Sequence, residues 1–229
     1  MQLVPLTADE RPLIPILLLV TASTGVIDAI CVLHLGVFAA YMTGTIILVG
    51  LQFVGTGKTA PGGGLIALAC FALGAILGGR LARRAKPRNR LLAESLIVVA
   101  VLVFLASLVI AFGNSADAMT RYAAIVLLAT GMGIQVAATR HRAIPDMTMP
   151  AATMVIHGLA YDSPVAGGQA ERYLRRFGVI IALMAGAASG ALIATWHVWA
   201  GLLLGAALIA AAGLLILKLV PLTAEAMGR

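Results

Sequence analysis

Six long apolar segments dominate the sequence and restrict what the chain can form. Each is about as long as the ~20 residues that a helix needs to cross the hydrocarbon core of a bilayer. Hydrophobic residues make up 61% of the chain and charged residues 11%, whereas soluble domains carry about 25% charged residues. We expect an all-α integral membrane protein, since only helices and closed barrels satisfy their backbone in lipid. The six segments are 13–35, 59–79, 92–112, 122–139, 177–196 and 200–221.

Two further segments, 37–57 and 147–160, are apolar but too polar or too interrupted to be clear spans. The second lies between Asp146 and Asp162, with only 15 residues separating the two carboxylates, and Pro150 interrupts it. Proline breaks or kinks a helix, and a span needs about 20 apolar residues. We expect each segment to form a short re-entrant or broken helix that enters the membrane and does not cross it.

The distribution of basic residues tests the number of spans. Of the 16 Lys and Arg residues, six lie in the loop 80–90. With six spans and the N-terminus inside, 14 of them fall on the inside and 2 on the outside, which the positive-inside rule favours. With eight spans the two sides receive equal numbers. A seven-span arrangement, in which only 37–57 of the two short segments crosses, divides them 13 to 3 and stays open. The net charge of +7 is explained by this anchoring and does not indicate nucleic-acid binding.

An internal repeat also favours six spans. Asp28 aligns with Gln135 at an offset of 107, Thr43 with Thr153 at 110, and the glycine pairs of the following helices at 112. Each half then consists of a helix, a short polar segment, a helix rich in small residues and a featureless apolar helix. Two halves of three spans must be inverted relative to one another, which is a common plan among transporters. The sequence thus predicts one membrane domain over 1–229, with repeats at about 13–112 and 122–221 and a basic cytoplasmic loop at 80–91.

Several short runs resemble one known family. They are GVIDA at 25–29 and FAAYMTGT at 38–45 in the first half, GMGIQVAATR at 131–140, and IPDMT at 144–148, which continues to GLAYDS. Together they resemble the YoaK-like membrane proteins, domain-of-unknown-function group 1275. The resemblance covers nearly the whole chain.

That resemblance implies a bacterial inner-membrane protein of about six spans and brings no chemistry with it. The chain departs from the family pattern at Thr45, where the family has asparagine, and at Val136, where it has asparagine after the glutamine. It also departs around His157, within what is usually a threonine-rich run. Whatever the threonine-rich run coordinates is expected to be altered here.

Asp28 is the main candidate for a functional residue. An ionisable residue in the middle of a membrane helix costs about 2.5–3.5 kcal/mol on insertion scales. Thr21, Thr24 and Cys31 share its helix face, which suggests a polar face toward a central cavity; the alternative is a hydrogen-bonding anchor between helices. Paired with Gln135 of the other half, Asp28 gives one proton-accepting side and one neutral side. This asymmetry suits a proton-coupled or cation-interacting site, and Asp28→Asn is expected to preserve folding.

Other polar residues of the two short segments are weaker candidates. Their threonines either line a pore or bond back to their own helix turns. His157 either contacts a substrate or proton, since histidine titrates near neutral pH, or is a structural residue. The predicted substrate or ion pathway consists of Asp28, Thr43, Thr45, Gln135, Asp146, Thr148, Thr153 and His157.

Glycine pairs at a spacing of four are typical of close helix packing in membranes. Gly74, Gly78, Gly186 and Gly190 are therefore assigned to packing. The sequence predicts no catalytic residue, metal site or cofactor. The run 55–59 resembles a phosphate-binding loop but lacks the first glycine, and Ser189 lacks the context of an intramembrane protease.

The sequence thus favours a small-solute or ion transporter or channel of the bacterial inner membrane, with proton coupling as one option and both termini in the cytoplasm. The expected partners are the lipid bilayer and an unidentified solute, and a homo-oligomer is an open option. The alternative function is a non-transporting structural protein or a subunit of a larger membrane complex. An enzyme is not expected.

Overall fold

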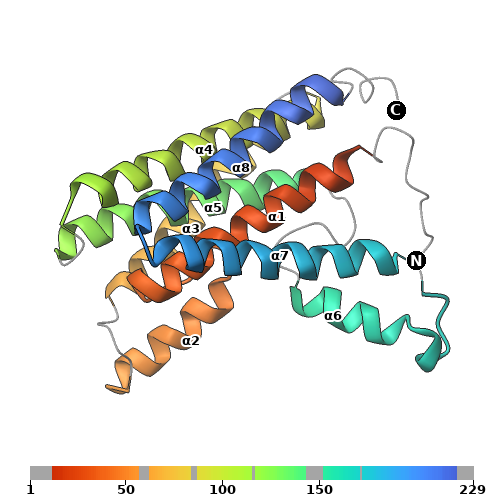
Figure 1. Cartoon of the computed structure of the whole chain (residues 1–229), viewed down its shortest axis with the longest axis horizontal. Coiled ribbons are helices and arrows are strands. Elements are labelled where there is room, and N and C mark those ends of the chain that lie inside the picture. The colour runs from red at the N-terminus through yellow and green to blue at the C-terminus, as the bar shows by residue number, and fades with distance from the viewer. Residues whose placement is uncertain are drawn as a thin grey trace.

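The computed structural model describes residues 12–56, 62–83, 87–114, 117–142, 152–170 and 172–220, and all regular structure within these ranges is helical (Figure 1). A π-helical turn, Cys31–Leu35, continues the first helix, and a 3-10 turn, Pro164–Ala166, follows the sixth. The helices are α1 (Leu13–Ile30), α2 (Met42–Phe53), α3 (Gly62–Ala82), α4 (Arg88–Phe112), α5 (Ala118–Arg142), α6 (Ala152–Tyr161), α7 (Tyr173–Ala194) and α8 (Val198–Leu219).

Six of these helices are long and apolar enough to cross a bilayer, which confirms a multi-pass membrane protein. They are α1 with its π turn, α3, α4, α5, α7 and α8. Several extend beyond the predicted segments into basic residues, so that α4 begins at Arg88 and α5 ends at Arg142. In contrast, α2 has 12 residues and α6 has 10. At 1.5 Å per residue these are about 18 and 15 Å long, about half of the hydrocarbon thickness.

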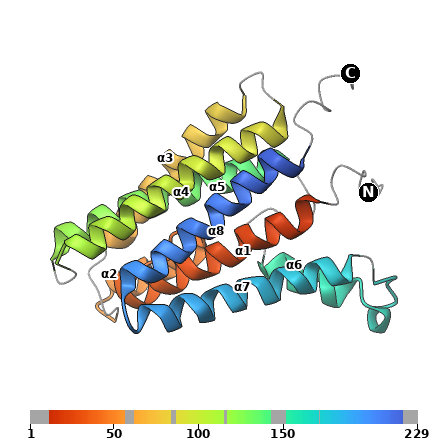
Figure 2. The same ribbon diagram turned by 45° about the horizontal axis from the view of Figure 1, so that its top comes forward.

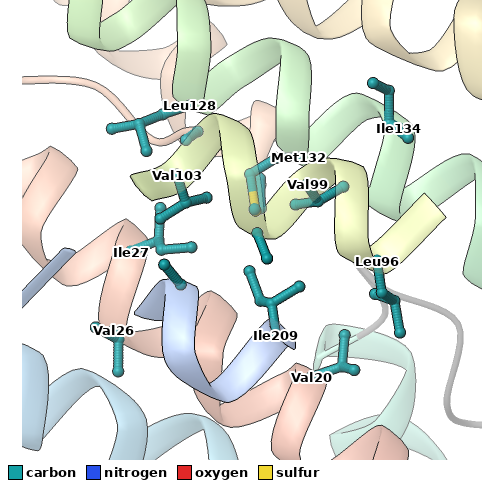
Figure 3. Close-up of a cluster of buried hydrophobic side chains, with 14 of the residues drawn as sticks. Val20, Val26, Ile27, Leu96, Val99, Val103, Leu128, Met132, Ile134 and Ile209 are labelled. Carbon is teal, nitrogen blue, oxygen red and sulfur yellow. The ribbon is translucent and has the colours of Figure 1, made fainter. Parts of the chain in front are cut away.

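The apolar core lies between α1, α4, α5 and α8 (Figure 3). Side chains from all four helices meet there without a polar group among those labelled, and ten of them are Val20, Val26, Ile27, Leu96, Val99, Val103, Leu128, Met132, Ile134 and Ile209. This side of α1 and α5 is closed by packed aliphatic side chains.

The helices that end the two halves, α4 and α8, contribute buried side chains to the core. Val103 of α4 and Ile209 of α8 are both 0% exposed, because α4 packs on α8 and on α5. An added methylene at Val103 would therefore strain the core. Val101, which is 51% exposed on the same helix, faces outward.

The helix pairs are related by exchange of the two halves of the chain. α3 packs on α5 as α7 packs on α1, and α4 packs on α5 as α8 packs on α1. The short helices follow the same rule, since α2 packs on α3 and α6 packs on α7. α4 of the first half and α8 of the second half lie side by side in both views (Figures 1 and 2).

Glycines set the closest approaches in both halves. A Cβ on Gly25 of α1 would meet the carbonyl oxygen of Leu183 and, at 2.9 Å, the backbone nitrogen of Ala187 on α7. A Cβ on Gly133 of α5 would likewise meet the carbonyl oxygen of Phe71 and, at 2.8 Å, the nitrogen of Ala75 on α3. The residues contacted on α7, Leu183 and Ala187, follow those contacted on α3, Phe71 and Ala75, by 112 positions in each case.

The contacts in the opposite direction match as well. Gly74 meets Thr130 and Gly78 meets Ile134, whereas Gly186 meets Ala22 and Gly190 meets Val26. Each contacted residue of α5 therefore follows its counterpart on α1 by 108 positions, which is also the separation of Gly25 and Gly133. The alignment of Asp28 with Gln135 uses an offset of 107, which differs by one residue from the offset of these glycine contacts. An offset of 108 pairs Asp28 with Val136 instead. Two helix backbones can touch only where small residues face each other, so the glycines fix how α1 lies along α7 and how α5 lies along α3.

The two short helices lie on the same side of the bundle and run in opposite directions. Figure 1 shows α2 and α6 beginning near the middle of the bundle's length and running toward opposite ends. In both views α6 lies beside α7, the long helix that follows it. The N-terminal ends of α2 and α6 thus point toward the centre of the molecule.

Topology can be tested by cysteine labelling in a background whose two native cysteines are replaced by alanine. With six spans and the N-terminus inside, single cysteines at Arg83 and Val165 should be protected from an impermeant thiol reagent applied outside. A cysteine at Asn114 should be labelled. Val165 is 99% exposed, so protection there reflects sidedness. A cysteine at Ala8 separates the alternatives, because it is protected with six spans and labelled with seven.

Candidate functional site

Asp28 organises the break between α1 and α2. Its Oδ1 accepts hydrogen bonds from the backbone N–H groups of Ala39 at 2.7 Å and Ala40 at 2.9 Å. Its Oδ2 accepts from the N–H of Tyr41 at 3.0 Å. The side chain is 4% exposed. One carboxylate therefore satisfies three successive backbone donors of the segment that leads into α2.

Thr45 closes the same segment from the other side. Its hydroxyl accepts from the N–H of Phe38 at 2.9 Å and donates to the carbonyl oxygen of Phe38 at 2.8 Å. Val37, Ala39 and Ala40 are at most 2% exposed. The non-helical backbone before α2 is thus buried in protein, and side chains of α1 and α2 replace the hydrogen bonds that water would make.

The chain leaves α1 through an unusual turn. Cys31–Leu35 is π-helical, and Gly36 ends it with φ 71°, a left-handed conformation that glycine adopts without strain. The chain then reverses, because the bonds to Asp28 bring residues 39–41 back beside a position two turns before Leu35. Single π turns are frequent at functional sites in helices.

A second polar contact joins the two halves close to Asp28. Gln135 of α5 donates from Nε2 to the Thr24 hydroxyl of α1 at 2.9 Å, and Thr24 donates to the carbonyl oxygen of Val20 at 3.0 Å. Gln135 is 0% exposed, yet its Oε1 has no hydrogen-bond partner among the residues that the structure describes. Thr24 lies one helical turn before Asp28. A buried acceptor without a partner is rare and calls for an explanation such as a bound water or ligand.

The other short helix is held differently. Arg176 of α7 donates from Nη1 to the carbonyl oxygen of Gly158 and to Oδ2 of Asp162, both at 2.6 Å. Its guanidinium packs on Gly158, where an added Cβ would lie 2.7 Å from Cζ. In the contact between α6 and α7 the glycine belongs to the short helix. In the contact between α2 and α3 it belongs to the long helix, where Gly64 of α3 accommodates Val49 of α2. The C-terminal end of α6 is therefore fixed to the start of α7 by a charged clamp.

The predicted pathway residues fall into three groups. Asp28, Thr45 and Gln135 are buried, and the first two are bonded to the backbone before α2. Thr43 and Thr153 are exposed, each as the second residue of its short helix. His157 is also exposed on α6, where its ring stacks on Tyr161 with 5.5 Å between centroids. Asp146 and Thr148 lie outside the described residues.

Sequence reasoning missed the role of Arg176 and the hydrogen bond of Thr24. The predicted segment 177–196 begins after Arg176, whereas this residue is inside α7 and 5% exposed. A signal was present, because Asp162 ends the polar segment and Arg176 follows 14 residues later. Nothing in the sequence singles out Phe38 or the amides of residues 39–41, which carry only backbone groups.

The arrangement presents hydrogen-bonding groups that can bind polar ligands. Among the described residues, no group of three or more His, Cys, Asp or Glu side chains is placed to hold a metal ion. Helix N-termini carry partial positive charge, and two of them point toward the centre of the bundle (Figure 1). The Asp28 carboxylate offsets this charge at α2. Position 136, which the glycine contact offset of 108 pairs with Asp28, is valine.

Comparison with known proteins gives a family but no activity. Residues 16–216 match the family described as "Protein of unknown function (DUF1275)". The chain belongs to this family. The match covers all six long helices except the ends of the first and last, and it confirms the resemblance found in the sequence. Neither the curated proteins nor the solved structures contain a match to this family member.

Proposed function

We propose that this family member is a transporter or channel for a small solute or ion, built from two inverted repeats of three spans. α1–α4 form one repeat and α5–α8 the other, and each contains one short re-entrant helix, α2 or α6. The main support for this proposal is the buried non-helical segment 36–41 between α1 and α2, in which backbone N–H groups donate to Asp28 and Thr45. Irregular backbone at membrane depth is tolerated only where it is buried in protein or lines a water-filled cavity.

The packing of the helices supports the repeat. The glycine contacts recur at constant offsets on α1 and α5 and on α3 and α7. An odd number of spans in each half requires that the second be inverted relative to the first. Transporters with inverted repeats bind their substrates where broken helices of the two halves meet. Here that place is the side of α1 and α5 away from the apolar core.

We propose that the solute or ion passes next to Gln135. This residue is buried at the contact between the halves, next to Thr24, and none of the described residues donates a hydrogen bond to its Oε1. A passing water, hydroxyl or ammonium group would supply the missing donor. Asp28 acts mainly as the anchor of the re-entrant segment in this scheme, and proton coupling through its carboxylate stays a prediction.

The test is flux in proteoliposomes of the full chain. Glycerol and urea entry is followed by stopped-flow light scattering, and proton entry by the fluorescence of enclosed pyranine. The wild-type protein should raise the flux of at least one of these above that of protein-free vesicles. Gln135→Leu should lower that flux roughly fivefold or more, because a lost hydrogen bond of about 1 kcal/mol corresponds to this factor.

Val126→Leu is the matched control, since Val126 lies on the same helix and is 41% exposed. Gln135→Leu should keep the melting temperature of the wild type within a few degrees, because Thr24 retains its bond to Val20. If Gln135→Leu transports as well as Val126→Leu, no pathway passes Gln135. If glycerol, urea and protons all cross no faster than in protein-free vesicles, the result favours the alternative of a non-transporting structural protein.

A further inference from the structure

A basic cavity lies where the first turns of α1 and α7 meet. Its volume is about 350 Å³ and it is lined by Ile14, Ala170, Arg172, Tyr173, Leu174 and Arg175. Arg175 is 8% exposed, whereas Leu174 is 86% exposed and Tyr173 46%. The lining thus includes two arginine residues and an apolar and aromatic rim. We propose that the cavity binds a phosphate-bearing anion, and this proposal does not depend on transport.

Two helices add to the positive potential of the cavity. α1 and α7 run parallel, since Gly178 contacts Leu18 and Gly186 contacts Ala22 farther along. Their N-terminal ends therefore lie side by side. Helix N-termini favour anions, because their first backbone N–H groups lack helical partners and the dipole is positive there. No lining residue among those described is acidic.

The two arginines suit a phosphate group. Guanidinium groups bind phosphate with paired, charge-assisted hydrogen bonds. Arg172 and Arg175 also have partners within the protein, but each guanidinium has five donors and can hold an internal partner and an anion together. Arg172, the residue before α7, has φ 59°, and Ala170 has φ 53°. Both are non-glycine residues in a left-handed conformation, which is uncommon and recurs at ligand sites.

The position of the cavity suggests where the anion comes from. Figure 2 shows the N-terminal ends of α1 and α7 at the same end of the bundle as the C-terminal end of α3 and the N-terminal end of α4. In the sequence, six of the 16 Lys and Arg residues lie within 80–90, where α3 ends and α4 begins. Basic pockets between membrane helices on the cytoplasmic side bind anionic lipid head groups. Exposed Tyr173 and Leu174 beside the cavity suit contact with the glycerol and acyl part of a lipid. A free phosphate would use the same two arginines without this rim.

Thermal unfolding of the delipidated full chain in detergent tests the site. Phosphatidylglycerol, phosphatidylcholine and inorganic phosphate are added separately. A site for phosphate-bearing anions raises the melting temperature with phosphatidylglycerol, inorganic phosphate or both, and not with phosphatidylcholine. A shift with phosphatidylglycerol alone assigns a lipid head group, and an equal shift with inorganic phosphate assigns the free anion.

Two variants remove the site in different ways. Arg172→Gln with Arg175→Gln removes the charge, and Ile14→Trp fills the cavity while keeping both arginines. Each should lower the apparent affinity roughly tenfold or more. Arg80→Gln, an exposed charge at the same end of the bundle, should bind as the wild type does.

If the double variant does not fold, Ile14→Trp decides alone. Undiminished binding by Ile14→Trp, or by a folded double variant, overturns the proposal. So does an equal shift with phosphatidylcholine, because that lipid has no net negative charge.

Discussion

Replacing Asp28 with alanine is expected to release the segment before α2 and to destabilise the protein by several kcal/mol. The carboxylate accepts from the N–H groups of Ala39, Ala40 and Tyr41, and residues 39 and 40 are at most 1% exposed. A buried donor left without a partner costs about 1–3 kcal/mol. The melting temperature in detergent should fall sharply, and hydrogen exchange at these three amides should become fast.

Asp28→Asn should have a smaller effect of the same sign. Its amide oxygen can accept from Ala39 and Ala40, but its NH₂ group then faces the N–H of Tyr41 as a second donor. This revises the sequence-based expectation that Asn at position 28 preserves folding. Asp117→Ala is the control, because Asp117 accepts from the N–H of Thr120 at an exposed helix start and should matter by about 1 kcal/mol or less.

The measurement also separates anchoring from transport. An Asp28→Ala protein that melts as the wild type does but loses flux would show that the carboxylate serves the pathway directly. Loss of stability with slowed accumulation is the expected result of an anchor.

Gly74→Leu and Gly186→Leu should each prevent stable folding. A Cβ at Gly74 would meet the carbonyl oxygen of Thr130, and one at Gly186 that of Ala22. These atoms belong to helix backbones and cannot turn aside as a side chain would. Forcing extra volume into a packed site costs about 1–3 kcal/mol or more, and here the two helices must separate. We expect little folded protein by size-exclusion chromatography.

Gly79→Leu is a control on the same helix as Gly74. No atom lies within 4 Å of a Cβ built at Gly79, and leucine favours helix over glycine by roughly 0.8 kcal/mol or more. This variant should fold as well as the wild type or better. Gly78 and Gly190 should show losses of intermediate size, since their nearest contacts are at 2.7 and 2.8 Å. Equal tolerance at Gly74 and Gly79 would mean that α3 does not pack on α5 as described.

Much of the architecture could be predicted from the sequence because bilayer thickness limits the length of a span. The six long segments each became one helix, although the ends of α4 and α5 extend into Asn89 and Arg142. These two residues are buried and bonded to one another, with Arg142 Nε donating to Asn89 Oδ1 at 2.8 Å. Hydropathy marks such polar residues as loop, because it does not register a partner 53 residues away.

The close packing of small residues could also be read from the spacing of glycines. Which backbone each glycine meets could not, because the contact depends on the crossing of α3 over α5 and of α7 over α1. The offset of 108 between the matching contacts of Gly25 and Gly133 differs by one from the offset of 107 given by aligning Asp28 with Gln135. The two polar side chains match chemically, but glycines fix the register of the helices.

The sequence by itself determined the membrane class, the six long helices and the presence of an ionisable residue inside the first. Only the tertiary structure decided what that residue does. The partners of Asp28 are backbone N–H groups of residues 39–41, which every residue except proline carries, so no side-chain pattern identifies them. The chain must first reverse after Leu35 before these donors reach the carboxylate, and that reversal is a property of the packed bundle.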